Sequence, residues 1–142
     1  MAKGNGIRIL IVDDQRNMRT TLGILLRGAG YTTDEAADGE TALQKIGQES
    51  YDLVLTDLRM GRIDGLDVLR RVREASPTTE VVVMTAYGTV ESAVAAMRLG
   101  AYDYLQKPFS EDELLVKVAK AFERKRLSGE VSLLTQEFRE RY

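Results

Sequence analysis

The sequence predicts an α/β protein with a doubly wound sheet of five parallel strands and helices on both faces. Three observations indicate this fold. Short β-branched, apolar runs alternate five times with stretches whose apolar residues recur at helical spacing. The connections between them are a few residues long, as in right-handed βαβ units. A chain of 142 residues, 44% of them hydrophobic, can bury the core of one such domain.

Five runs rich in β-branched and apolar residues predict the strands. They cover residues 8–12, 32–36, 53–56, 80–84 and 103–106. The first, third and fourth are almost continuously apolar, which is typical of strands covered on both faces. The second is more polar and predicts a strand at an edge of the sheet.

Five amphipathic stretches between and after these runs predict the helices. Their apolar stripes begin at Met18, Ala42, Leu66, Val90 and Leu114. Helix-stopping residues end the stretches, for example Gly28 after the first and Ser76–Pro77 after the third. Ser110 and Glu113 form a Ser-x-x-Glu capping box at the start of the last helix.

Composition and charge exclude several classes of function. The sequence has neither cysteine nor histidine. This excludes disulfides, zinc sites with thiolate ligands and catalysis by histidine within this sequence. The formal net charge of −2 is too balanced to indicate nucleic-acid binding by this segment. No apolar run approaches the roughly 18 residues of a membrane span, and there is no signal-peptide core. A cytoplasmic protein is expected.

The chain is expected to divide into three parts. Residues 1–6 are polar and contain glycine, which predicts a disordered amino terminus, and residues 7–126 predict the folded domain. Residues 127–142 predict a helical linker that leads to output domains outside this sequence, or else the tail of a stand-alone domain. Its apolar stripe is formed by Leu127, Val131, Leu134 and Phe138. The stripe suits pairing of two copies as a short coiled coil, and the alternative is that it folds back onto its own domain.

Side chains capable of chemistry stand at or just beyond four strand ends. They are Asp13, Asp14, Asp57, Thr85 and Lys107. Because ligands of open parallel sheets bind beyond the carboxyl ends of the strands, we expect these side chains to meet at one edge. Each alone is a weak signal, since an Asp pair after a strand is more often a turn or a helix cap. We interpret Gly39, Gly61 and Gly65 as loop glycines, because nothing matches a glycine-rich phosphate loop.

Taken together, the set predicts a site that accepts a phosphoryl group. Three carboxylates at adjacent strand ends carry about three negative charges, an arrangement that raises pKa values or requires cations. Mg²⁺ takes oxygen ligands and keeps several waters, and Lys107 completes the charge balance. A metal ion and an ammonium group can neutralise the oxygens of a transferred phosphoryl group, which leaves Asp57 as the nucleophile.

The sequence resembles the response-regulator receiver domains of two-component signalling, over residues 7–124. The matching stretches are ILIVDD at residues 9–14, TDLRM at 56–60, VMTA at 83–86 and YLQKPF at 104–109. The resemblance implies a flavodoxin-like sheet with strand order 2-1-3-4-5. Within this family, residues 84–86, 93–94 and 100–104 resemble the branch of sigma-54-dependent, NtrC-like transcriptional activators.

The resemblance implies a phosphorylation-activated switch that controls transcription, and not an enzyme that turns over a substrate. Asp57 would accept a phosphoryl group from the phosphohistidine of a sensor histidine kinase. Mg²⁺ would be bound by Asp14, Asp57 and the backbone carbonyl of Arg59, with Asp13 acting through water. The family usually carries proline after the methionine of this loop. Here Gly61 stands in that place and loosens the loop that carries Arg59.

The resemblance also assigns the residues that transmit the signal. Lys107 would pair with the phosphoryl oxygens, Thr85 would hydrogen-bond one of them, and Tyr104 would be the aromatic residue that reorients. Receivers of this branch are commonly held as homodimers, which implies pairing through the carboxy-terminal helix and the receiver surface. Arg59 and Tyr87 are bulky enough to hinder a hydrolytic water, which predicts a long-lived phosphoryl group.

Three alternative functions are compatible with the predicted fold, but the sequence lacks residues that the first two require. A flavin-binding module needs a hydroxyl- and glycine-rich phosphate loop, and Asp13–Asp14 would repel a phosphate there. A metal-dependent phosphatase with an aspartyl nucleophile needs a second acid two residues after Asp57, where Arg59 stands. A stand-alone receiver would act through protein–protein interaction alone.

Overall fold

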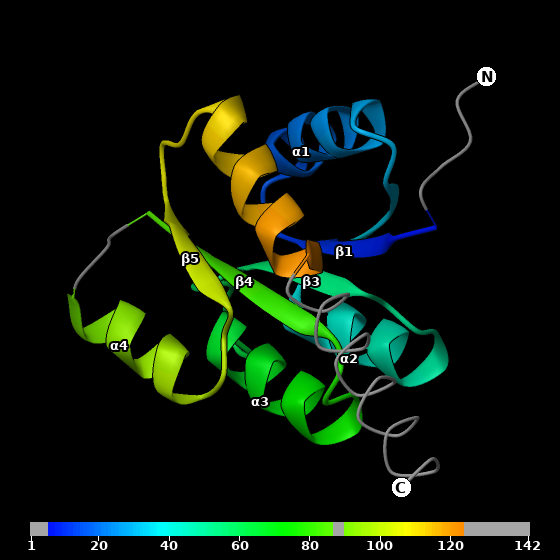
Figure 1. Cartoon of the computed structure of the whole chain (residues 1–142). Coiled ribbons are helices and arrows are strands. Elements are labelled where there is room, and N and C mark those ends of the chain that lie inside the picture. Colours follow the sequence, from blue (N-terminus) through cyan, green and yellow to red (C-terminus); the bar gives the residue numbers. More distant parts are fainter. Residues whose placement is uncertain (1–5, 87–89, 124–142) are drawn as a thin grey trace, which may run out of the picture.

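The computed structural model describes residues 6–86 and 90–123, and it confirms the predicted fold. The elements are β1 (Arg8–Val12), α1 (Arg16–Gly28), β2 (Thr32–Ala36), α2 (Gly39–Gln48), β3 (Leu53–Asp57), α3 (Gly65–Ala75), β4 (Glu80–Thr85), α4 (Val90–Arg98), β5 (Asp103–Gln106) and a last helix over residues 111–123. The five strands form one sheet in the order β2-β1-β3-β4-β5 (Figure 1). Most of the predicted amino-terminal tail and the whole predicted linker lie outside the described residues.

All four strand pairs are parallel, and the burial of each strand follows its place in the sheet. The central β3 is buried at every residue, as its apolar run predicts. β2 lies at an edge, where its Thr, Asp and Glu side chains remain partly or fully accessible to solvent. The prediction of an edge strand at residues 32–36 is therefore confirmed.

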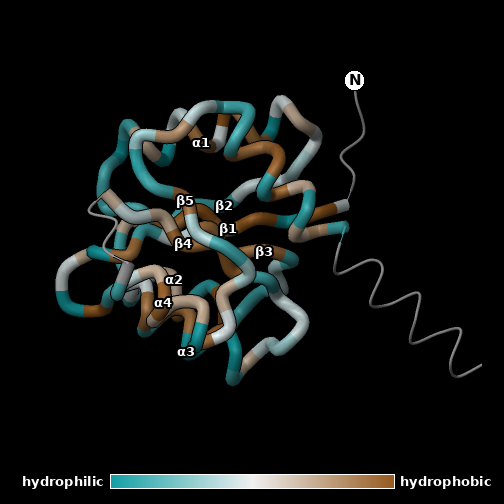
Figure 2. Tube along the Cα trace, turned by 60° about the vertical axis from the view of Figure 1, so that its left-hand side comes forward, coloured by the Kyte–Doolittle hydropathy of each residue, from teal (hydrophilic) through white to brown (hydrophobic). Residues whose placement is uncertain are grey.

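Helices cover both faces of the sheet, and alternate strand residues form two cores. α1 and the helix over residues 111–123 cover one face, and α2, α3 and α4 cover the other (Figure 1). Ile9 and Ile11 of β1 point to the first layer, while Leu10 and Val12 point to the second. Figure 2 shows these hydrophobic strands enclosed between the two helical layers. Complete burial of one such side chain stabilises the fold by about 1.5–3 kcal/mol.

Side chains at the starts of the helices determine where α2 and α3 begin. The Asp38 carboxylate accepts a hydrogen bond from the Thr41 amide at 2.7 Å, which caps α2. Asp64 and Asp67 form a reciprocal capping box at the start of α3, which the sequence pattern did not reveal because the third position is Asp and not Glu. The interpretation of Gly39 and Gly65 as loop glycines is wrong, since each is the first residue of a helix.

None of the helices in the described parts of the chain is both long and apolar enough to span a membrane.

Candidate functional site

The carboxyl ends of the strands come together at one edge of the sheet. The strand register pairs Val12 with Thr56, and Thr85 with Gln106. Asp13 directly follows Val12 and therefore lies level with Asp57. Lys107 follows Gln106 and lies further along the strand direction, because Asp57 pairs with Met84 and Met84 pairs with Leu105. A cavity of ≈ 290 Å³ opens at this edge, and its lining comprises Asp14, Gln15, Asp57, Leu58, Arg59, Thr85, Ala86 and Lys107.

Asp13 is buried, and all of its oxygen atoms are engaged within the protein. Its Oδ1 accepts a hydrogen bond from the Gln15 amide at 2.9 Å, and its Oδ2 lies 2.9 Å from Lys107 Nζ. The Arg19 guanidinium donates to the Asp13 carbonyl oxygen at 2.7 Å. Sequence reasoning missed Arg19, because an arginine on a helix face usually indicates a solvated surface. Asp13 thus orders the loop after β1.

Asp14 and Asp57 differ from Asp13 in what they offer to a ligand. Asp14 is exposed at the mouth of the cavity, and Asp57 is 7% exposed at its floor. Each of the three residues has a carboxylate oxygen within 4.8 Å of the others. Lys107 Nζ lies 3.7 Å from Asp57 Oδ1, so one ammonium group is shared between Asp13 and Asp57.

Burial raises the pKa of the Asp57 carboxyl group. The Lys107 charge lowers this pKa, whereas the Asp13 and Asp14 charges raise it, and the net shift is upward. An upward shift means that the protein alone does not fully compensate the ionised carboxylate. A cation bound beside Asp57 would stabilise its ionised carboxylate.

The ligand atoms at this edge fit a hard divalent cation. Three carboxylates offer oxygen ligands, which Mg²⁺ prefers, and the accessible mouth leaves room for the waters that Mg²⁺ retains. Arg59 lines the same cavity. Gly61, two residues further, has φ of +78°, which proline cannot adopt. The loop therefore follows a path that the usual proline would prevent.

The two residues expected to transmit the signal lie in different places. Thr85 is buried and lines the cavity. Tyr104 does not line the cavity, and it is 37% exposed on β5. Lys117 Nζ lies 5.2 Å from the centre of the Tyr104 ring and donates to the Tyr104 carbonyl oxygen at 2.5 Å. Tyr87, expected to shield the site, lies outside the described residues.

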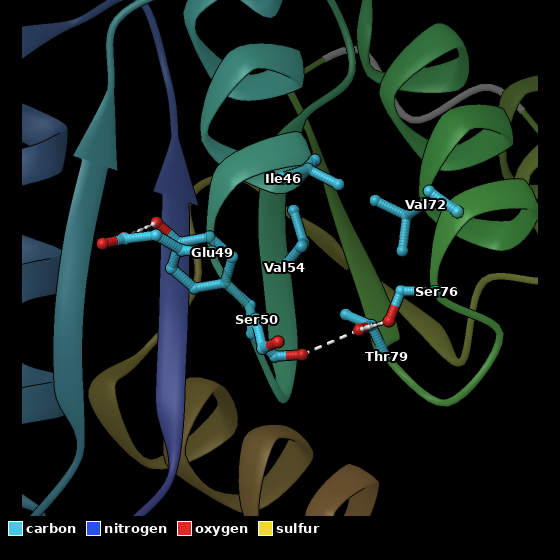
Figure 3. Close-up of a pocket in the computed structure, with 9 residues that line it drawn as sticks. Ile46, Glu49, Ser50, Val54, Val72, Ser76 and Thr79 are labelled. Atoms are coloured by element: carbon cyan, nitrogen blue, oxygen red, sulfur yellow. Dashed lines mark hydrogen bonds between the residues drawn. The ribbon is translucent and has the colours of Figure 1, made fainter.

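A second cavity of ≈ 120 Å³ lies at the opposite edge of the sheet, between the ends of α2 and α3 (Figure 3). Ile46, Val54 and Val72 project into it. The hydroxyl groups of Ser76 and Thr79 lie 2.6 Å apart, and Thr79 donates to the Tyr51 carbonyl oxygen at 2.7 Å. These polar groups bind one another, so the cavity at the carboxyl edge is the stronger candidate site.

Comparisons with known proteins agree with this geometry. The sequence model of the response regulator receiver domain matches residues 9–119. The transcriptional regulatory protein ZraR of Klebsiella oxytoca is 42% identical over 125 residues, which cover 88% of this chain and 28% of ZraR. The structure of NtrX from Brucella abortus with ADP has a TM-score of 0.84 at 36% identity and covers 89% of this chain and 29% of that one. The CheY-like receiver domain protein of Methanospirillum hungatei JF-1 has a TM-score of 0.83 at 28% identity and covers 86% of this chain and 98% of that one.

The relatives differ in how much of their length this chain represents. It spans less than a third of ZraR and of NtrX, but nearly all of the Methanospirillum domain. ZraR and NtrX are regulators of the NtrC-like branch, so the predicted likeness to that branch is confirmed.

Proposed function

This chain belongs to the family of response regulator receiver domains, and we propose that it is a signalling switch in which Asp57 is the phosphoacceptor. One observation carries the proposal. A buried carboxylate at the end of the central strand lies 3.7 Å from a lysine ammonium, with carboxylate oxygens of two further acids within 4.8 Å. Among the described residues, no other group of three acids shares this geometry.

The proposed reaction is a single phosphoryl transfer to Asp57 from the phosphohistidine of a sensor histidine kinase. An Asp57 carboxylate oxygen attacks phosphorus, and a phosphorus–oxygen bond forms. The phosphorus–nitrogen bond breaks, and the imidazole nitrogen leaves with the bonding electrons. Lys107, already beside Asp57 Oδ1, neutralises charge on the transferred oxygens.

Mg²⁺, when bound, supplies further neutralisation of the phosphoryl oxygens. Asp14, Asp57 and the Arg59 carbonyl would hold it at the mouth of the cavity. Asp13 would act through water, because its two carboxylate oxygens already bind the Gln15 amide and Lys107.

The conformational response is proposed to begin at Thr85. A hydrogen bond from its hydroxyl group to a phosphoryl oxygen, worth about 1.5–3 kcal/mol, would draw the segment after β4 inward. Tyr104 would then leave its exposed position and fill the space vacated. This is a population shift between two packings, so the active form would exist at a low level without phosphate.

The output is proposed to be control of transcription, and for the NtrC-like branch it depends on sigma-54. Exposed apolar side chains mark the surface that would carry the signal. They are Val94 and Met97 on α4, Tyr104 on β5 and Val116 on the last helix. Homodimerisation through this surface and residues 127–142, and a place in the cytoplasm where the kinase presents its phosphohistidine, belong to the same proposal.

Beryllofluoride, which mimics a phosphoryl group, tests this function. We expect it to bind in the presence of Mg²⁺ and to shift the amide resonances around Asp57, Thr85 and Tyr104 in a ¹H–¹⁵N spectrum. The Asp57→Asn protein should show none of these shifts. Equal shifts in both proteins would show that the acceptor lies elsewhere.

A further inference from the structure

The loop that leaves the phosphoacceptor strand is held at both ends by glycines. Residues 58–64 run from the end of β3 to the start of α3, and they include Arg59 beside the cavity. The Leu58 amide donates to the Met84 carbonyl oxygen at 2.8 Å, and the Gly65 amide donates to the Leu58 carbonyl oxygen at 2.8 Å. The first residue of α3 therefore packs directly against the peptide that carries Asp57.

Gly65 permits this contact because it has no side chain. A Cβ atom at position 65 would collide with the Asp57 carbonyl oxygen and would lie 2.8 Å from Leu58 Cα. Both neighbours are backbone atoms of the phosphoacceptor segment, so neither can rotate away as a flexible side chain would. A larger residue must push the start of α3 away from Asp57 or displace the Asp57–Leu58 peptide.

Gly39 permits the corresponding contact at the other end of the loop. A Cβ atom at position 39 would lie 2.5 Å from the carbonyl oxygen of Ile63 and 2.5 Å from its Cγ2. Gly39 is the first residue of α2, so the starts of two helices close on one loop. Gly47 and Gly28 differ, because a Cβ atom at either position would meet nothing within 4 Å, and at Gly23 it would meet only the flexible end of the Arg27 side chain.

We propose that Gly65 and Gly39 are positioning residues for the Asp57 site. Their missing side chains allow α3 and α2 to clamp the loop over residues 58–64, which fixes the Asp57–Leu58 peptide and the backbone of Arg59. The clamp sets where the Asp57 carboxylate and the Arg59 carbonyl stand relative to Asp14. The inference rests on the proposed function, because that function assigns Mg²⁺ to these three groups.

The test compares Gly65→Ala and Gly39→Ala with Gly47→Ala, a matched control in α2. Each protein is shown to be folded by circular dichroism, and its Mg²⁺ affinity is then measured by calorimetric titration. We expect Gly65→Ala to weaken Mg²⁺ binding at least tenfold and Gly39→Ala several-fold, with Gly47→Ala unchanged. In the metal-free proteins, the Leu58 amide resonance should move in the first two variants and not in the control.

Two results would overturn the positioning role of the glycines. Folded Gly65→Ala and Gly39→Ala proteins that bind Mg²⁺ as the unaltered chain does would overturn the positioning role. If Gly65→Ala does not fold, the Mg²⁺ affinity of Gly39→Ala alone tests the proposal. Weakened binding would support the positioning role, and unchanged binding would overturn it. Loss of fold in both would also overturn the proposal, because the glycines would then serve folding and not the site. A chain that binds Mg²⁺ but accepts no phosphoryl group would refute the proposed function alone.

Discussion

Asp13 and Asp14 are adjacent in sequence, yet the structure places them in opposite environments. Asp13 is fully buried and binds Lys107, the Gln15 amide and Arg19, whereas Asp14 is exposed at the mouth of the cavity. A buried carboxylate is tolerated only when paired and hydrogen-bonded, and Asp13 meets that condition without a metal. We therefore propose that a cation takes its direct carboxylate ligands from Asp14 and Asp57, not from Asp13.

Replacement of Asp14 by Asn is expected to weaken Mg²⁺ binding at least tenfold while the fold survives. The substitution removes one direct ligand and about one negative charge from a crowded site. Calorimetric titration and urea unfolding of the same protein would measure both effects. Unchanged Mg²⁺ affinity would show that Asp14 is only a surface residue of the loop.

The raised pKa of Asp57 predicts how the stability of the fold depends on pH. Its folded-state pKa is raised, mainly by burial, so its contribution to stability is complete below the ordinary carboxyl pKa and is lost as pH rises through the folded value. In metal-free buffer, Asp57→Asn should be more stable than the unaltered chain at pH 7, because Asn carries no charge that must be desolvated. Urea unfolding should show that the difference in unfolding free energy between the two proteins shrinks towards pH 4. A difference that does not change with pH would contradict a raised pKa for Asp57.

At the scale of elements, β5 and the last helix meet at Tyr104, the proposed switch residue. Lys117 donates to the Tyr104 carbonyl oxygen, lies over the Tyr104 ring and is 3.6 Å from Asp103. The contacts with the Tyr104 carbonyl oxygen and Asp103 place the Lys117 ammonium, and its contact with the ring favours the outward position of Tyr104. A cation–π contact at an exposed site is worth about 0.5–1 kcal/mol, enough to bias a two-state equilibrium.

Lys117→Met should therefore increase the population in which Tyr104 turns inward. Methionine keeps most of the length of the side chain but removes the charge. We expect beryllofluoride to bind about two- to fivefold more tightly, which corresponds to the energy of the lost contact. Lys120→Met, an exposed position on the same helix, is the control and should bind as before. Equal affinities in all three proteins would exclude a restraining role for Lys117.

At the scale of the molecule, the sequence was sufficient to predict the architecture. Residues 8–12, 32–36 and 103–106 are strands in the structure, with the predicted bounds. The physical cause differs between strands. Residues 8–12 form a buried strand and read as a continuous apolar run, whereas residues 32–36 and 103–106 form the more polar edge strands and were located by the regular alternation of strands with amphipathic helices. The same pattern identified the strand ends, and the structure brings Asp57, Thr85 and Lys107 around one cavity.

The details of the site were not predictable in this way. The contacts of Gly65 with Asp57 and of Gly39 with Ile63 depend on sub-ångström placement of one element against another. The hydrogen bond from Arg19 to the Asp13 carbonyl oxygen depends on the rotation of α1 over the sheet. Sequence periodicity describes the face of an element but does not define these distances. The roles of the individual site residues stay predictions.

Pairing of two chains through residues 127–142 also stays a prediction, because those residues lie outside the described part of the chain. Sedimentation of the full chain should show a dimer that a version ending at Arg126 does not form. If both versions sediment as monomers at tens of micromolar, with and without beryllofluoride, then residues 127–142 do not form a dimerisation element.

The central claim is that Asp57 accepts a phosphoryl group, and intact-mass spectrometry tests it most directly. The chain is incubated with Mg²⁺ and a small phosphodonor, and the same is done with Asp57→Asn and with excess chelator. We expect the unaltered chain to gain the mass of one phosphoryl group, and neither the variant nor the chelated sample to gain it. An equal gain by Asp57→Asn, or no gain by the unaltered chain in Mg²⁺, would contradict the assignment of Asp57.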